Sequence, residues 1–144
     1  MIVRAATADE LDVVARLWWE SFQSTGLARS GDDDAPALRR RLDIELSGGW
    51  RLFVAEDGGA IVGMLTLAGN TLSQLFIAPD RQGQGVGTRL FAHACAELPG
   101  GFTLKTRVAN GKARRFYEAR GMRLDRVGPD PTGDPRPSAW YRWP

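Results

Sequence analysis

The chain has 144 residues, of which 43% are hydrophobic and 25% charged, and its net charge at pH 7 is +2. These values exclude a disordered chain and predict a single domain over residues 1–144. No apolar run approaches the roughly 18 residues of a membrane span, and the N-terminus lacks the apolar core of a signal peptide. With a lone Cys95 and no possible internal disulfide, we expect a cytoplasmic protein without a membrane partner. The small positive charge suits a small anionic ligand and does not indicate nucleic acid.

The first third of the chain predicts one strand and two helices. A strand is expected at 2–6, followed by a capping box at 7–10 with Thr7 as N-cap and Glu10 three residues later. The helix after it has apolar residues at helical spacing, namely Leu11, Val14, Leu17, Trp18 and Phe22. After a loop over 24–36, the segment 37–46 repeats leucine every four residues, which predicts a second helix with one apolar stripe.

The rest of the chain predicts six strands and two helices. Strands are expected at 50–56 and 60–68 around the turn sequence DGG, and at 71–78 before Pro79. A helix is expected at 86–98, a strand at 102–108 and a helix at 110–121 that ends at Gly121. The last strands are 122–127 and 139–143, and the final one is interpreted as an edge strand able to pair across a dimer. The segment between them, 128–138, is proline-rich and contains no residue typical of a core.

The sequence DRQGQGVGTRL, at 80–90, places three glycines at alternate positions before the expected helix. A P-loop is excluded because Thr88 and Arg89 follow Gly87 where the motif requires lysine and then serine or threonine. A dinucleotide fingerprint is excluded because its third glycine position holds Thr88. Two interpretations remain: a plain glycine-rich connector, or a loop whose backbone N–H groups and helix start hold a pyrophosphate.

Two segments resemble the GCN5-related N-acetyltransferase (GNAT) family. Gln82-x-x-Gly85-x-Gly87, preceded by LFIAP, is similar to the family motif Q/R-x-x-G-x-G/A. NGKARRFYEARGM, at 110–122, is similar to the family segment N-x-x-A-x-x-F-Y-E-x-x-G-F, with Met122 in place of the usual aromatic residue. The resemblance implies a single mixed α/β domain, with a central, mostly antiparallel, twisted sheet of about seven strands flanked by four helices.

The resemblance also implies acetyl-coenzyme A as the cofactor, coenzyme A as the product, and no metal. In the family, the glycine loop binds the pyrophosphate, the preceding strand lines the pantetheine arm, and the downstream segment also contacts the cofactor. The cofactor-binding residues implied in this way are Phe76, Ile77, Ala78, Gln82, Gly83, Gln84, Gly85, Val86, Gly87, Thr88, Asn110 and Phe116. Asn110 is also well suited to be the N-cap of its helix. Lys112, Arg114 and Arg115 either meet the cofactor's 3′-phosphate or form a solvated basic face.

The resemblance places the family's catalytic tyrosine at Tyr117, as the general acid that protonates the leaving thiolate. The structural alternative is a tyrosine that merely packs beside Phe116. No carboxylate lies in the strand 71–78, so the general base is not identified; Glu20, Asp33 and Asp34 are candidates if the first helices flank the acceptor. Trp18, Trp19 and Phe22 are candidates for an aromatic wall beside the acceptor. The shared helix face of Trp18 and Phe22 favours core packing for these two, whereas Trp19 points elsewhere.

The function that follows is transfer of an acetyl group to a primary amine of a small molecule or peptide, by direct attack in a ternary complex. One alternative is a catalytically silent acyl-coenzyme A-binding module of the same fold. A nucleic-acid-binding domain is disfavoured, because the arginines on the expected helices alternate with acids and no reader motif is present. Either a monomer or a homodimer is expected.

Overall fold

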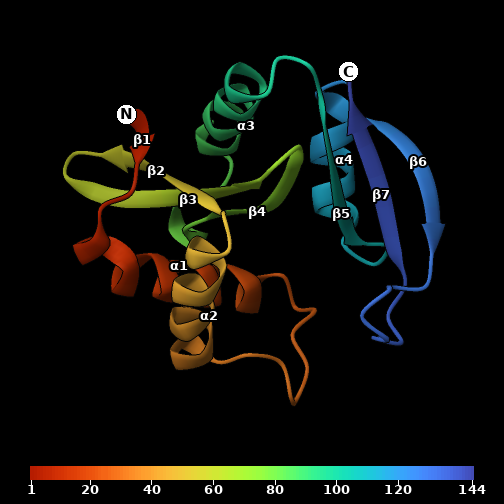
Figure 1. Ribbon diagram of the computed structural model, residues 1–144, viewed down its shortest axis with the longest axis horizontal. Helices are drawn as coiled ribbons and strands as arrows, with labels where there is room; N and C mark the ends of the chain where they lie inside the picture. The colour runs from red at the N-terminus through yellow and green to blue at the C-terminus, as the bar shows by residue number, and fades with distance from the viewer. The chain divides into compact units, whose positions relative to one another are not determined.

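The computed structural model describes all 144 residues, which group into two compact units. We call Met1–Glu97 the N-terminal unit and Leu98–Pro144 the C-terminal unit. Figure 1 shows their elements in chain order, and the order of strands and α-helices is the predicted one. Two short 3₁₀ turns, Ala8–Glu10 and Pro79–Arg81, are additional. No helix is both long and apolar enough to span a bilayer.

The N-terminal unit is an antiparallel sheet covered by helices on both faces (Figure 1). Its four strands lie side by side in the order in which they occur in the sequence: β1 (Ile2–Ala5), β2 (Arg51–Asp57), β3 (Ala60–Ala68) and β4 (Thr71–Ile77). Helices α1 (Leu11–Ser24) and α2 (Ala35–Ser47) cover one face, and α3 (Val86–Glu97) covers the other. Because successive β3 side chains point to opposite faces, Met64 packs under α1 and α2 while Gly63 faces α3.

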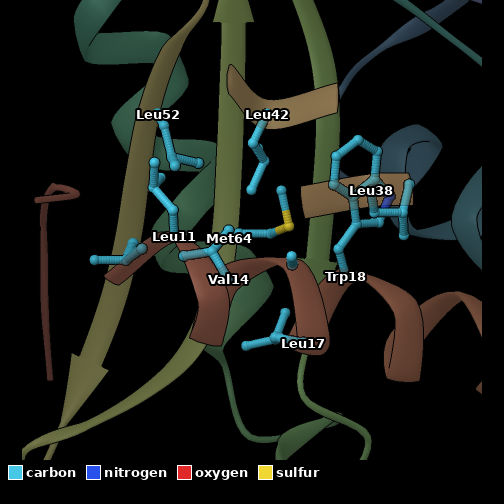
Figure 2. Close-up of a cluster of buried hydrophobic side chains, with 10 residues drawn as sticks. Leu11, Val14, Leu17, Trp18, Leu38, Leu42, Leu52 and Met64 are labelled. Atoms are coloured by element: carbon cyan, nitrogen blue, oxygen red, sulfur yellow. The ribbon is translucent and has the colours of Figure 1, made fainter. Parts of the chain in front are cut away.

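The core between the sheet and helices α1 and α2 is built from the predicted apolar stripes. Figure 2 shows side chains from both helices converging on β2 and β3. The cluster contains Leu11, Val14, Ala15, Leu17, Trp18, Leu38, Leu42, Leu52, Val54 and Met64. Phe22, which was expected in the same stripe, is only half-buried at the end of α1. Burial of these side chains, rather than helix propensity, supplies most of the stability of such helices.

The C-terminal unit is a three-stranded antiparallel sheet with one helix, α4 (Gly111–Ala119). Its spatial order is β5 (Phe102–Arg107), β7 (Ser138–Trp143), β6 (Arg123–Gly128). The prediction that the final strand is an edge strand is therefore wrong, because β7 pairs with β5 on one side and with β6 on the other. Backbone groups paired on both sides cannot pair across a dimer, so β7 is not a dimerisation edge.

The loop at 128–138 also differs from the prediction, because it contains a buried residue. Asp130 is only 7% exposed. Its carboxylate accepts hydrogen bonds from Lys105 Nζ at 3.0 Å, from Thr132 and from Ser138 Oγ at 2.8 Å. Burial alone would raise the Asp130 pKa, but these donors outweigh it and hold the pKa well below its usual range. A buried carboxylate whose two oxygens both accept hydrogen bonds fixes the loop where apolar residues are lacking.

Arg4 and Glu10 tie β1 to the turn before α1, and Glu10 also makes the predicted capping-box contact with Thr7. Arg4 Nη2 lies 2.7 Å from both Glu10 Oε2 and Glu56 Oε1, and the Thr7 backbone N–H donates to Glu10 Oε1 at 2.8 Å. The hydrogen bonds from Arg4, and then that from Thr7, lower the pKa of Glu10 from 4.5 to about 2. The stabilisation by Glu10 is therefore present above its ordinary pKa and is lost as the pH falls toward about 2.

Glu10→Gln should lower the melting temperature at neutral pH and reduce its dependence on pH in the acid range. The variant lacks a carboxylate whose protonation destabilises the fold, so its melting temperature should fall less than that of the wild type between about pH 5 and pH 2. Circular dichroism melts at stepped pH measure this difference. Glu45→Gln, which removes a carboxylate outside this network, is the control. Parallel curves for wild type and Glu10→Gln would contradict the assignment.

Candidate functional site

In the N-terminal unit, the end of β4 and the loop after it are held by local hydrogen bonds. The Ala78 N–H donates to the Val62 carbonyl at 2.9 Å, which extends the pairing with β3 by one residue. The Gln82 amide Nε2 donates back to the Ile77 carbonyl at 3.2 Å and to Ser24 Oγ at 3.4 Å. Phe76, Ile77 and Ala78 are half-buried at this strand end. Hydrogen bonds thus fix Gln82, the first residue of the glycine motif, to the end of β4.

Gly83 and Gly85 have backbone conformations that favour glycine. Their φ angles are +79° and +86°, and a Cβ built on either would meet no atom within 4 Å. The strain of a side chain there comes from the backbone conformation alone. Gln84, between them, is exposed, and its amide donates to the Asp80 carbonyl at 3.2 Å. The glycines therefore shape an open, exposed turn immediately before α3.

The helix α3 begins at Val86, so the loop residues run directly into its first turn. Val86 and Gly87 are buried and Thr88 is exposed. The Arg89 N–H donates to the Gly85 carbonyl at 3.2 Å, which marks the first helical hydrogen bond. In an α-helix the first N–H groups have no carbonyl one turn earlier to donate to, and the helix start adds a partial positive charge. Helix starts of this kind are common binding places for anions in proteins.

One residue that positions this turn was missed by the sequence analysis. A Cβ on Gly63, in β3, would lie 2.8 Å from Leu90 Cδ1 and 2.9 Å from Val86 Cγ1. Gly63 thus allows α3 to approach the sheet closely at its N-terminal turn. An isolated glycine within a strand pattern is the signal that could have identified it.

Gly63→Ala should destabilise the protein by about 1–3 kcal/mol, because the added methyl group overpacks the contact with α3. The nearest atoms are ends of side chains, so Val86→Ala in the same chain should relieve the part of the overlap that involves Val86 and leave the part with Leu90. Chemical denaturation of both single variants and the double variant measures the coupling. A double variant as unstable as the sum of the two single variants would contradict a direct contact.

In the C-terminal unit, Asn110 is the N-cap of α4, as predicted. Its Oδ1 accepts a hydrogen bond from the Ala113 N–H at 3.1 Å, and its backbone carbonyl accepts from Arg114 N at 3.0 Å. The cap uses only the side-chain oxygen of Asn110. The amide Nδ2 of Asn110 is a donor that the cap does not use, so capping is compatible with a ligand contact.

Tyr117 is the only buried residue of α4, with 7% of its surface exposed. Its ring lies edge-on to Phe116, with ring centroids 5.2 Å apart. Burial raises the pKa of the Tyr117 phenol above its ordinary value, and the nearby Arg120 offsets this only in part. The hydroxyl therefore stays protonated throughout the neutral and mildly alkaline range. Phe116 is half-buried, with the Arg120 guanidinium 3.6 Å from its ring centroid.

The basic face of α4 is partly engaged within the C-terminal unit. Arg114 Nε donates to the Tyr141 hydroxyl at 3.0 Å, and that hydroxyl donates to Glu118. Tyr141 is fully buried on β7, so this contact fastens α4 to its sheet. Lys112 and Arg115 are exposed. Of the three predicted phosphate contacts, Arg114 is thus also a structural residue.

The three candidate bases in the N-terminal unit differ in their surroundings. Asp34 is the N-cap of α2, and its carboxylate accepts from the Ala37 N–H at 2.9 Å. Glu20 and Asp33 are exposed. The structure thus gives Asp34 a structural role.

Trp19, the candidate acceptor wall, is half-buried and packs against the core cluster.

Comparisons with known proteins point to one family. The family model described as "Acetyltransferase (GNAT) domain" matches residues 48–122, which include the glycine loop and Tyr117. Peptidyl-lysine N-acetyltransferase YjaB of Salmonella typhimurium is 38% identical over 77 residues, which cover 53% of this chain and 52% of that relative. The chain therefore matches about half the length of this relative.

Two solved structures show the same fold. The solution structure of apo YjaB from Escherichia coli has a TM-score of 0.77 and 25% identity, and the match covers 99% of this chain and 98% of that one. The PaiA N-acetyltransferase of Thermoplasma acidophilum, solved in complex with coenzyme A, has a TM-score of 0.75 at 15% identity over 99% and 98% of the two chains. With the family model matching more than half of its residues, this chain belongs to the GNAT acetyltransferase family.

Proposed function

We propose that this protein transfers an acetyl group from acetyl-coenzyme A to a primary amine. The observation that carries the proposal is the open turn at Gly83 and Gly85, which leads directly into the first turn of α3. The space beside both glycines is free of protein atoms within 4 Å of an added Cβ, so a phosphate can approach the backbone closely. The coenzyme A complex of the PaiA N-acetyltransferase, a protein of the same fold, supports this choice of ligand.

In this proposal, the pyrophosphate is bound by the N–H groups of the loop from Gln82 to Thr88. The end of β4, at Phe76, Ile77 and Ala78, lines the pantetheine arm. Asn110 donates from Nδ2 to the cofactor while its Oδ1 caps α4, and Phe116 provides an apolar contact. Lys112 and Arg115, both exposed, supply positive charge for the 3′-phosphate.

The chemical step proposed is direct attack of the neutral amine on the thioester carbonyl. The nitrogen–carbon bond forms and the carbon–sulfur bond breaks, while the amine gives up a proton to water. A backbone N–H at the end of β4 stabilises the developing oxyanion. Tyr117 donates its phenolic proton to the departing sulfur and recovers it from solvent. Its raised pKa keeps this proton in place at neutral pH.

The acceptor is proposed to be a primary amine of a small molecule or of a peptide. The relative named as a peptidyl-lysine N-acetyltransferase supports a lysine side chain as one member of this class. Both kinds of acceptor present an alkyl ammonium group that must lose a proton before attack.

Thermal unfolding with acetyl-coenzyme A, coenzyme A, NADH and ATP, each in turn, tests the binding half of the proposal. A ligand at about 100 times its dissociation constant should stabilise the fold by roughly 2.7 kcal/mol. For a protein of this size, the melting temperature should rise by several degrees, on the order of 5 °C. Stabilisation by the two coenzyme A species alone supports the proposal, whereas stabilisation by NADH or ATP alone contradicts it.

Release of free thiol from acetyl-coenzyme A in the presence of an amine panel tests the catalytic half. Amine-dependent release supports an enzyme. Binding of acetyl-coenzyme A without release on any amine would instead support a catalytically silent acyl-coenzyme A-binding module.

A further inference from the structure

One arginine of the N-terminal unit is held differently from the others. Arg41, on α2, is half-buried, and its guanidinium carbon lies 5.3 Å from the ring centroid of Trp18 and 5.7 Å from that of Trp50. It makes no hydrogen bond and no ion pair within the chain. Its guanidinium therefore lies against two indole rings with its N–H donors unused by the protein.

All other half-buried arginines donate to an acceptor within the chain. Most of them bond a carboxylate, Arg114 bonds a tyrosine hydroxyl, and Arg120 bonds a backbone carbonyl; they are Arg4, Arg39, Arg81, Arg107, Arg114, Arg120 and Arg136. Arg41 is the exception to this pattern. None of its side-chain nitrogens is buried without a partner, so its N–H groups face solvent and are open to a ligand.

A shortage of acids does not explain the exception. Carboxylates outnumber arginines in residues 1–97. Asp43, two residues after Arg41, pairs with Arg39 at 2.8 Å. Glu45 lies one turn beyond Arg41 on the same helix, yet the two form no ion pair. The donors of Arg41 are thus left for an acceptor from outside the chain.

The aromatic cluster connects Arg41 to the strand end where the acetyl group is proposed to lie. The ring of Trp18 is 6.1 Å from that of Trp50 and 6.4 Å from that of Phe76, which is on β4. Figure 2 shows Trp18 at the edge of the core cluster, between α1 and α2. A molecule whose amine reaches β4 near Phe76 can therefore place another group near Arg41, within the same unit.

We propose that Arg41 binds a carboxylate of the amine acceptor, so that the protein prefers amines that carry an acidic group. This inference rests on the proposed acetyl transfer for the identity of the reaction. A guanidinium forms two parallel hydrogen bonds with a carboxylate, and the contacts with two indole rings restrict the position of the Arg41 guanidinium. Omega-amino acids are the simplest members of this acceptor class, and a lysine beside an acidic residue in a peptide presents the same groups.

The test compares γ-aminobutyrate with propylamine, the same amine without its carboxylate. Wild-type kcat/KM for acetylation should be roughly 10- to 100-fold higher for γ-aminobutyrate. Arg41→Gln should abolish this preference, and Arg41→Lys should restore it in part, because lysine keeps the charge but loses the paired donors. Arg40→Gln, which removes an exposed arginine next in sequence, should keep the preference. A peptide with a lysine beside aspartate, compared with one beside alanine, separates free from peptide-borne carboxylates.

A binding readout makes failure of this inference distinguishable from failure of the proposed function. Addition of γ-aminobutyrate should shift the NMR signals of the Trp18 and Trp50 indole N–H groups in the wild type and in Arg40→Gln, but not in Arg41→Gln. Equal acetylation of both amines, or the same preference in Arg41→Gln, would overturn the role of Arg41 and leave acetyl transfer standing. Shifts that depend on Arg41 without acetylation of any amine would refute the proposed function and leave the carboxylate site standing. Absence of shifts in the folded wild type would overturn the site itself.

Discussion

Tyr117→Phe should lower kcat for acetyl transfer about 100-fold, while the affinity for acetyl-coenzyme A stays within about twofold. The phenolic proton is needed only when the carbon–sulfur bond breaks, so its loss affects the chemical step and not the binding of the cofactor. Phenylalanine retains the ring that lies edge-on to Phe116. Steady-state kinetics together with calorimetric titration of acetyl-coenzyme A separate the two effects.

The pH dependence of kcat gives a second test of the role of Tyr117. Because burial raises the pKa of Tyr117, ionisation of this residue should cause no loss of wild-type activity below about pH 10. An alkaline loss of kcat at lower pH that disappears in Tyr117→Phe would contradict the burial seen in the structure.

Tyr141→Phe is the matched control in the same unit. This substitution removes a buried hydroxyl that bonds Arg114 and Glu118, so it should lower the melting temperature more than it lowers kcat. Tyr117→Phe should show the reverse. If both variants lose kcat only in proportion to their loss of stability, Tyr117 is a packing residue and not the general acid.

Gly85→Ala should weaken acetyl-coenzyme A binding at least about 10-fold, a loss of roughly 1.4 kcal/mol. An alanine at φ +86° is strained, and relief of this strain rotates the peptide planes on both sides of residue 85. The N–H groups that are proposed to hold the pyrophosphate then no longer point toward one anion. Isothermal titration with acetyl-coenzyme A measures the loss.

Gly59→Ala separates strain from ligand contact. Gly59 lies in the turn between β2 and β3, has a φ of +84°, and has equally open surroundings. Both variants should therefore lose similar stability, about 1–2 kcal/mol, but only Gly85→Ala should lose affinity. Equal affinities in the two variants would mean that the glycine turn is a connector and not the phosphate site.

The element types and the two motif segments could be read from the sequence, because they depend on residues close together in the chain. The apolar spacing in α1 and α2, the Asn110 cap and the Glu10 capping box involve contacts within one or two helical turns. The glycines of the loop before α3 are similar, since a positive φ is a property of one residue. These features needed no knowledge of how distant segments pair.

Only the tertiary structure decided the features that depend on distant residues. The central position of β7 follows from pairing with strands on both sides, and a final strand carries no local sign of this. The buried charge of Asp130 is stabilised by Lys105, which lies 25 residues away in the chain and donates to it. Arg41 stands out only once the partners of all the other half-buried arginines are known. The physical reason is that helix periods, caps and turns arise from short-range backbone geometry, whereas burial and ion pairing depend on which surfaces the fold brings together.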